Sequence, residues 1–298
     1  MEPRTIAVIG GDARQGWAAD ALEFLGHRVP RFGVPRRAEE EDGQSGKQPR
    51  NAASLGEAMA EADVVLCPVP FTRDGIWLSH TAEPPIPISG LLKGLRPGHR
   101  LIAGDFPEEL RAHCEEKGIP LHALLEREDF ATLNAIPTAE ATIAQAIIKS
   151  SGNLQQSDCL VLGFGRCGRA IARKLKGLDA NVTVALRRWP NACAALTAGF
   201  QAVDMEALPW LVPRPRYVFN TIPAPVLGEE LLRLLPKEAL LLDVASAPGG
   251  IDFEAARQMG LNAELLPSLP GKYAPRAAGE AIAQVTQIIL QEEEEAKL

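Results

Sequence analysis

Six residues near the middle of the chain, Gly163-Phe164-Gly165-Arg166-Cys167-Gly168, have the spacing G-x-G-x-x-G. An apolar run at 159–162 precedes them, and Ile171, Leu175 and Leu178 follow at helical spacing. In such a turn Gly163 permits the tight bend, Gly165 lets the backbone approach a pyrophosphate, and Gly168 lets the helix pack on the strand. The pattern predicts a dinucleotide site; a tight glycine turn without a ligand is the alternative.

The end of the next predicted strand, 182–186, indicates which dinucleotide binds. NAD sites usually place Asp or Glu there to bind the ribose, but residues 182–201 contain neither, and the strand ends in Arg187 and Arg188. Two guanidinium groups suit a 2′-phosphate. We therefore predict NADP, with two solvated surface arginines as the alternative.

A second glycine turn follows the predicted N-terminal strand 5–9. Aligning Gly10 with Gly163 puts Asp12 at the position of Gly165 and Gln15 at that of Gly168. A carboxylate about 5 Å from a phosphate charge costs about 3 kcal/mol at an effective dielectric of about 20. This turn is therefore expected to bind something other than a dinucleotide.

Strand and helix patterns alternate along the whole chain, which predicts an α/β protein with two Rossmann-like, doubly wound parallel-sheet domains and a cleft between them. Further strands are expected at 27–32, 63–66, 100–104, 216–220, 239–243, 262–266 and around Leu121. Helices are expected at 17–25, 55–60, 107–117, 138–150 and 275–291, and near Asn191, Glu229 and Asp252. The boundary is placed at Pro137, giving a substrate domain at 1–137 and a nucleotide domain at 138–274. The final helix is expected to pack back on the first domain, with a fraying charged tail at 292–298.

Composition excludes several classes of protein. With 298 residues, 46% hydrophobic and 23% charged, the chain is long enough for two cores. Its net charge of −7 argues against a nucleic-acid surface, and no apolar run is long enough to cross a membrane. The N-terminus has no signal-peptide layout, and five scattered cysteines without a C-x-x-C pair indicate neither disulfides nor a metal site. A cytoplasmic protein with small ligands is expected.

Several short segments at predicted strand ends are unusual. They are GDARQ at 11–15, CPVP at 67–70, NAIPTAE at 134–140, NTIP at 220–223, ASAPGG at 245–250 and LPGKYAP at 269–275. Together with the glycine turn, and in this order, they resemble the A subunits of dipicolinate synthase over nearly the whole chain. Ala141 departs from that family's pattern, which has glycine there, and Ala247 replaces a basic residue. The loop at 35–54 has no counterpart in the resemblance, and no role is assigned to it.

The resemblance implies a sporulation enzyme of the mother cell. It would transfer a hydride from dihydrodipicolinate, derived from 4-hydroxytetrahydrodipicolinate, to NADP and release pyridine-2,6-dicarboxylate. It also implies a heteromeric complex with a second, flavoprotein-like B subunit. A homodimer is expected from general frequencies alone.

A dicarboxylate substrate requires cationic groups, and Arg14, in the first strand-helix turn, is the first candidate. A salt bridge from Arg14 to Asp12 is the competing interpretation. Lys272 and Arg276 could neutralise the second carboxylate or be solvated. The remaining predicted substrate contacts are Gly11, Asp12, Gln15, Pro68, Val69, Pro70, Asn134 and Thr138, of which Asn134 and Thr138 could instead cap the helix at 138–150.

Loss of a hydride leaves a proton for a base or for solvent to remove. All five histidines lie between residues 27 and 122, so the candidate bases are Asp12, Glu126 and Glu140. Predicted contacts to the nicotinamide side of the cofactor come from two further strand ends, Thr221, Ile222 and Pro223 with Ala245 and Ser246. For these five, an ordinary turn is the alternative.

Two other functions remain open. One is an NADP-linked dehydrogenase of amino or hydroxy acids, of the alanine dehydrogenase type, which the absence of histidine beyond residue 122 disfavours. The other is a nucleotide-binding regulatory subunit whose catalysis belongs to a partner.

Overall fold

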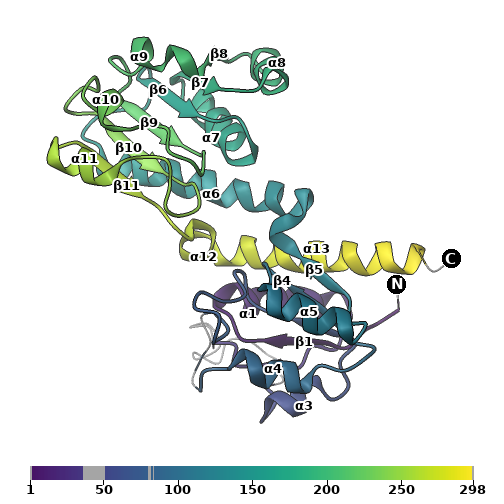
Figure 1. Ribbon diagram of the computed structural model, residues 1–298. Helices are drawn as coiled ribbons and strands as arrows, with labels where there is room; N and C mark the ends of the chain where they lie inside the picture. The colour runs from purple at the N-terminus through teal and green to yellow at the C-terminus, as the bar shows by residue number, and fades with distance from the viewer. Residues whose placement is uncertain (1, 36–50, 80–81, 83, 297–298) are drawn as a thin grey trace. The chain divides into compact units, whose positions relative to one another are not determined.

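The computed structural model describes residues 2–35, 51–79, 82 and 84–296 (Figure 1). The chain divides into two compact units, Met1–Asn134 with Ala274–Leu298, and Ala135–Tyr273. Each unit has one parallel sheet with a hydrophobic core on both faces. The prediction of two doubly wound α/β domains is confirmed. Most of the loop at 35–54 lies outside the described residues.

The first unit contains a five-stranded sheet in the order β2-β1-β3-β4-β5. Its strands are β1 (Ile6–Ile9), β2 (Arg31–Phe32), β3 (Val64–Leu66), β4 (Arg100–Ala103) and β5 (Leu121–Ala123). Its helices are α1 (Ala13–Phe24), α3 (Leu55–Met59), α4 (Ile88–Gly94), α5 (Glu108–Glu116), the short η1 (Leu124–Glu126) and α13 (Pro275–Glu295). The strand order reverses between β1 and β3, where open parallel sheets hold their ligands.

Alternating side chains of β1 fill two cores in this unit. Ile6 and Val8 lie in one core with Ile282 and Ile289 of α13, while Ala7 and its neighbours lie in the core on the other face. Fully buried strands of a parallel sheet are apolar on both sides for this reason. The C-terminal helix is therefore part of the first unit.

The second unit contains a six-stranded parallel sheet in the order β11-β10-β9-β6-β7-β8. Its strands are β6 (Asp158–Leu162), β7 (Asn181–Leu186), β8 (Gln201–Asp204), β9 (Tyr217–Asn220), β10 (Leu240–Asp243) and β11 (Asn262–Leu265). Its helices are α7 (Arg166–Gly177), α8 (Trp189–Thr197), η2 (Met205–Ala207), α9 (Leu208–Leu211), α10 (Glu229–Leu232), α11 (Phe253–Gln258) and α12 (Leu269–Tyr273). Counted from β6, this is the order 3-2-1-4-5-6 of a dinucleotide-binding fold, with its switch point between β6 and β9.

Helix α6 (Glu128–Lys149) differs from its prediction. It begins ten residues before the expected start and runs through Pro137 without ending. Thr138 therefore lies inside the helix and does not cap it, so that part of the prediction is wrong. Thr138 instead accepts a hydrogen bond on its carbonyl oxygen from Thr142 Oγ1 at 2.7 Å.

The predicted fraying tail is wrong as well, because α13 continues to Glu295. Three successive glutamates each have a cationic partner. Glu292 pairs with Arg127 at 2.8 Å, Glu294 pairs with Arg4 at 2.7 Å, and Glu293 contacts both Arg100 and His122. These ion pairs fix the end of the helix to the first unit.

Candidate functional site

The glycine turn follows β6 at the switch point of the second sheet. Gly163 has a φ of +92°, and a Cβ there would lie 2.6 Å from Thr221 Oγ1. A Cβ on Gly168 would lie 2.2 Å from the carbonyl oxygen of Gly163, whereas one on Gly165 would have no atom within 4 Å. The first and third glycines thus serve packing, and the second faces open space, as a bound pyrophosphate requires.

The helix after this turn offers backbone donors. Gly165 is the N-cap of α7 and provides no side-chain hydrogen bond to the helix start. The first N–H groups of a helix attract anions because they lack carbonyl partners and carry the positive end of the dipole. Arg166, in the first turn, is exposed and adds positive charge. The turn and the start of α7 therefore fit a dinucleotide phosphate.

Phe164 and Cys167 of this turn serve packing. Phe164 is 3% exposed and makes an edge contact with Phe200, so only its backbone can reach a ligand. Burial raises the pKa of the Cys167 thiol despite the nearby Arg166, which argues against a reactive cysteine. The sequence did not reveal that Arg169 supports the turn: its Nε donates to Phe164 O at 3.0 Å and its guanidinium lies over the Phe164 ring.

Arg187 and Arg188 come directly after β7 and are both exposed. Within the residues that the structure describes, neither side chain takes part in a hydrogen bond or an ion pair. Most other arginines with described surroundings do have such partners, for example Arg31 with Asp20 and Glu23. Two unpaired guanidinium groups at this strand end leave their donors available to a phosphate.

The loop after β9 is held by a buried amide. Asn220 is fully buried; its Nδ2 donates to Ile222 O at 3.1 Å and its Oδ1 accepts from Ile222 N at 3.1 Å. Thr221 Oγ1 donates to Leu162 O at 2.8 Å, which joins this loop to the strand before the glycine turn. Thr221 and Ile222 are half-buried and Pro223 is exposed, so these predicted cofactor residues lie beside the turn.

The loop after β10 is held by a buried carboxylate that the sequence did not identify. Asp243 is fully buried and accepts hydrogen bonds from Ala245 N at 2.9 Å and from Gly250 N at 2.7 Å. A Cβ on Gly250 would lie 2.6 Å from Asn220 Nδ2, so the two loops pack directly together. Asp243 thereby positions the predicted residues Ala245, half-buried, and Ser246, exposed.

In the first unit, the turn after β1 has a different construction. Asp12 is the N-cap of α1 and forms a capping box with Gln15, whose Oε1 accepts from Asp12 N at 3.1 Å. The Gln15 side chain crosses the turn, because a Cβ on Gly11 would lie 2.4 Å from its Cδ. A side chain therefore fills this turn, whereas the turn at 163–168 has free space at Gly165. Gln15 Nε2 is buried and has no hydrogen-bond partner among the described residues.

Arg14 is 7% exposed and its guanidinium is held on one edge. Nε donates to Asp12 Oδ1 at 2.9 Å and Nη2 donates to Asp12 Oδ2 at 2.8 Å, so the salt bridge left open by the sequence is present. Nη2 also donates to Val69 O in the loop after β3, across the switch point of the first sheet. Within the described residues no hydrogen bond uses Nη1, which leaves that end of the group for a ligand.

Comparison with known proteins places these features in a family. Residues 5–125 match the family model described as the N-terminal domain of the A subunit of dipicolinate synthase. The chain is 31% identical over 292 residues to the dipicolinate synthase A subunit of Bacillus subtilis, covering 96% of each protein. The chain belongs to the family of dipicolinate synthase A subunits. The resemblance predicted from its strand-end segments is confirmed.

Two solved structures of dipicolinate synthase A chains share the fold along the whole length. The Bacillus subtilis chain superposes with a TM-score of 0.85 at 30% identity, covering 99% of this chain and 98% of that one. The Bacillus halodurans chain also has a TM-score of 0.85, at 28% identity, covering 96% and 97%. Both units of the present chain are therefore features of this family.

The other predicted substrate residues have varied surroundings. The side chains of Pro68 and Val69 are buried, so the loop after β3 faces the turn through its backbone. Asn134 and Thr138 lie in α6, one half-buried and one buried. Lys272 is exposed in α12. The structure thus brings Gly11, Asp12, Arg14, Gln15 and Val69 together in one unit.

Arg276, at the start of α13, contacts two other residues of the first unit. Its Nε donates to Glu280 at 2.8 Å and its guanidinium lies 5.0 Å from the centre of the Trp17 ring. Both members of the Arg276–Glu280 pair are largely exposed. Its described partners are thus on α1 and α13 and not at the turn that holds Arg14.

Each of the three candidate bases has a cationic partner. Glu126 pairs with Arg111, and Glu140 pairs with Lys174 at 2.8 Å; both glutamates are more than half exposed. Exposed pairs of this kind are weak and exchange readily with solvent. The bidentate pairing of Asp12 with Arg14 is more buried, and taking a proton would break it. Their catalytic role stays a prediction.

No helix within the described ranges is long and apolar enough to cross a membrane. Within the same ranges, no three His, Cys, Asp or Glu side chains form a cluster that could hold a metal ion.

Proposed function

We propose that this chain is an NADP-dependent oxidoreductase that converts dihydrodipicolinate, formed from 4-hydroxytetrahydrodipicolinate, to pyridine-2,6-dicarboxylate. The observation that carries the proposal is the free space at Gly165, which directly precedes α7. No side chain caps the start of that helix, and the chain belongs to the family of dipicolinate synthase A subunits. The position after β6 at the switch point is where a dinucleotide binds in this fold.

The choice of NADP rests on the end of β7. The backbone from Gly163 to Gly168 would hold the pyrophosphate, and the exposed Arg187 and Arg188, which have no ion pair among the described residues, would neutralise the 2′-phosphate. No Asp or Glu lies within residues 182–201 to bind a free 2′-hydroxyl. Thr221, Ile222, Pro223, Ala245 and Ser246 would line the nicotinamide side, with Asn220 and Asp243 fixing their loops.

The substrate is assigned to the turn after β1. Its two carboxylates need donors, and Arg14 Nη1 is oriented for one of them by the contacts of Nε and Nη2. Gln15 Nε2, a buried donor without a described partner, would donate to the ligand. An unmade hydrogen bond at a buried donor costs about 1–3 kcal/mol, which an acceptor on the substrate would recover. Lys272, Asn134 and Thr138 remain further candidates.

The chemistry needs little from the protein beyond positioning. When bound, NADP supplies the hydride acceptor. The ring also loses a proton as it becomes aromatic, and aromatisation favours the reaction. Glu126, Glu140 and solvent are the candidate proton acceptors, and Asp12 would act only after release from Arg14. Asp12 otherwise orients Arg14 toward the substrate.

A partner is part of the proposal. The Bacillus subtilis relative is named as the A subunit of its enzyme, which supports a complex with a second polypeptide, here proposed as the flavoprotein-like B subunit. The chain would then supply nucleotide binding and hydride transfer within that complex.

One assay tests the proposal. The purified chain, alone and with the B subunit, is given NADP and freshly generated 4-hydroxytetrahydrodipicolinate, and reduced nicotinamide and pyridine dicarboxylate are followed together. We expect the two products to appear in equal amounts, with NAD a poorer oxidant. Absence of pyridine dicarboxylate from both mixtures, in protein that binds NADP, would reject the substrate assignment. Product formation that requires the B subunit and does not require NADP would make the chain a regulatory component.

A further inference from the structure

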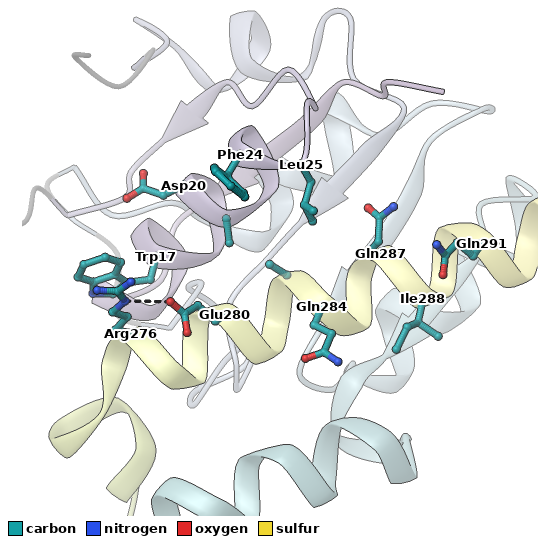
Figure 2. Close-up of a pocket in the computed structure, with 12 residues that line it drawn as sticks. Trp17, Asp20, Phe24, Leu25, Arg276, Glu280, Gln284, Gln287, Ile288 and Gln291 are labelled. Carbon is teal, nitrogen blue, oxygen red and sulfur yellow. Dashed lines mark hydrogen bonds and ion pairs between the residues drawn. The ribbon is translucent and has the colours of Figure 1, made fainter. Parts of the chain in front are cut away.

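An open groove lies between α1 and α13 on the first unit, and Arg14 is not among the residues that line it (Figure 2). It encloses about 770 Å³. The two helices touch closely at one point, since a Cβ on Gly279 would lie 2.4 Å from Arg14 O. The groove opens further along the pair, and the residues that line it include Ala21, Phe24, Leu25, Ala283, Gln284 and Ile288.

Two large apolar side chains stand beside this groove in solvent. Phe24 is 92% exposed and Leu25 is 52% exposed, at the end of a helix whose other face is buried. A single exposed apolar residue needs no explanation, and Trp210 in the second unit, 80% exposed, is such a case. An aromatic side chain next to an apolar hollow is different, because a hollow and a side chain that can fill it on the same surface indicate an interface.

The charges around the groove are neutralised within the chain. Arg276 pairs with Glu280, and Asp20 pairs with Arg31 at 2.7 Å. The other polar lining residues are the amides Gln284, Gln287 and Gln291, which can both donate and accept hydrogen bonds. A face of this kind is complementary to itself. In a chain with a net charge of −7, it is a face on which a second copy meets little repulsion.

We propose that the groove between α1 and α13 is the interface of a homodimer, in which Phe24 of each copy enters the groove of the other. Under two-fold symmetry both copies use the same surface, so each copy contributes one Phe24 and one groove. Such an interface gives a closed dimer and not a longer assembly. Trp17, fixed under the Arg276 guanidinium, forms a rigid wall of the hollow. None of the residues that line the groove belongs to the turn at 163–168 or to the turn at 10–15.

The oligomeric state of the full chain tests this. Light scattering coupled to size-exclusion chromatography, over about 1 to about 100 μM, should show a dimer whose fraction rises with concentration. Phe24→Ser should raise the dissociation constant at least tenfold, with NADP binding unchanged. Trp210→Ser is the matched control, because it removes an equally exposed aromatic from another surface, and it should leave the dimer intact.

A second measurement does not depend on the fold of the Phe24 variant. Gln284 is exposed at the groove, so a Gln284→Cys, Cys193→Ser chain should be linked to a second copy by a bifunctional maleimide. Trp210→Cys on the same background should not. A wild-type chain that stays monomeric, or a dimer that Phe24→Ser leaves intact, would overturn the proposal. If the wild type were monomeric and Phe24→Ser no longer bound the B subunit, the groove would belong to that partner instead.

Discussion

The carbonyl oxygen of Gly163 occupies the space where Gly168 would carry a side chain, because a Cβ on Gly168 would lie 2.2 Å from it. Strand β6 and helix α7 meet at this contact. Gly165, between the two, has no atom within 4 Å of its would-be Cβ and a φ of −76°, a value that any residue can adopt. Gly168 is thus required by the packing of the protein itself, whereas the protein's own packing would accept a side chain at Gly165.

Gly165→Ala should separate binding from folding. Its methyl group meets no atom of the protein, so the melting temperature should stay within a few degrees, while a pyrophosphate close to the backbone would be displaced. We expect the Kd for NADP to rise at least tenfold, measured by calorimetry. Gly228→Ala is the matched control, because Gly228 is also a helix N-cap with open space around it. Equal NADP affinity in both variants would contradict the placement of the cofactor.

Gly168→Ala should instead lower stability, since backbone atoms must move to admit the methyl group. A loss of about 1–3 kcal/mol in the free energy of unfolding is expected from overpacking of this kind. Chemical denaturation of Gly168→Ala and Gly165→Ala side by side measures it. Equal stability of the two variants would contradict the close contact.

Arg188→Ala and Arg187→Ala should change which nucleotide is preferred. A hydrogen bond to a charged group contributes about 1.5–3 kcal/mol, so the Kd for NADP should rise about 10- to 100-fold, and the Kd for NAD should hardly change. Arg257→Ala, which removes an exposed arginine of α11 paired with Glu254, is the control. If NAD binding weakened as much as NADP binding, the two arginines would not distinguish the 2′-phosphate.

The sequence predicted the sheets well because most of their strands are short, buried apolar runs. β8 was missed, since Gln201–Asp204 is only partly buried and carries polar residues at both ends. Pro137 was taken as a helix boundary on its local preference, yet the helix continues through it. The end of α13 was missed because its glutamates find partners such as Arg127 and Arg4, which are far away in the sequence.

Features of the candidate site that depend on local backbone geometry could be predicted from the sequence, and features that depend on how loops fold back could not. The three glycines at 163, 165 and 168 act through local backbone geometry, so their spacing was sufficient to predict the conformation of the turn. Asn220 and Asp243 act through hydrogen bonds to the loops that follow them, and strand patterns do not show how those loops fold back. For Arg14 both interpretations had a local basis, and the structure contains the salt bridge, while no hydrogen bond among the described residues uses Nη1.

Arg14→Ala should act on the substrate alone. Losing the oriented guanidinium should raise the KM for the dihydropyridine dicarboxylate by about 10- to 100-fold, from the roughly 1.5–3 kcal/mol typical of a charged hydrogen bond. The Kd for NADP should be unchanged. Arg28→Ala is the control, because it removes another paired arginine of the same unit, whose partner Glu61 has no proposed catalytic role. Unchanged kinetics in Arg14→Ala would reject the carboxylate assignment.

The ion pairs at the end of α13 should make the first unit sensitive to acid. Hydrogen bonds from Arg127 lower the pKa values of both Glu292 and Asp129 below their ordinary values of 4.5 and 3.8. A carboxyl group with a lowered pKa in the folded state stabilises the protein above its unfolded pKa, and this contribution disappears as the pH falls through the folded pKa. Stability should therefore decline as the pH falls below about 4.5.

Glu292→Gln should remove part of that decline. The variant should be less stable than the wild type near neutral pH and should approach it in acid, where the wild-type carboxyl is protonated as well. Glu295→Gln is the control, because Glu295 lies one turn further along the same helix without a described ion pair. Thermal unfolding at a series of pH values measures the difference. If the two variants follow the same curve as the wild type, the end of α13 is not held by Arg127, and the helix would fray as its charged sequence suggests.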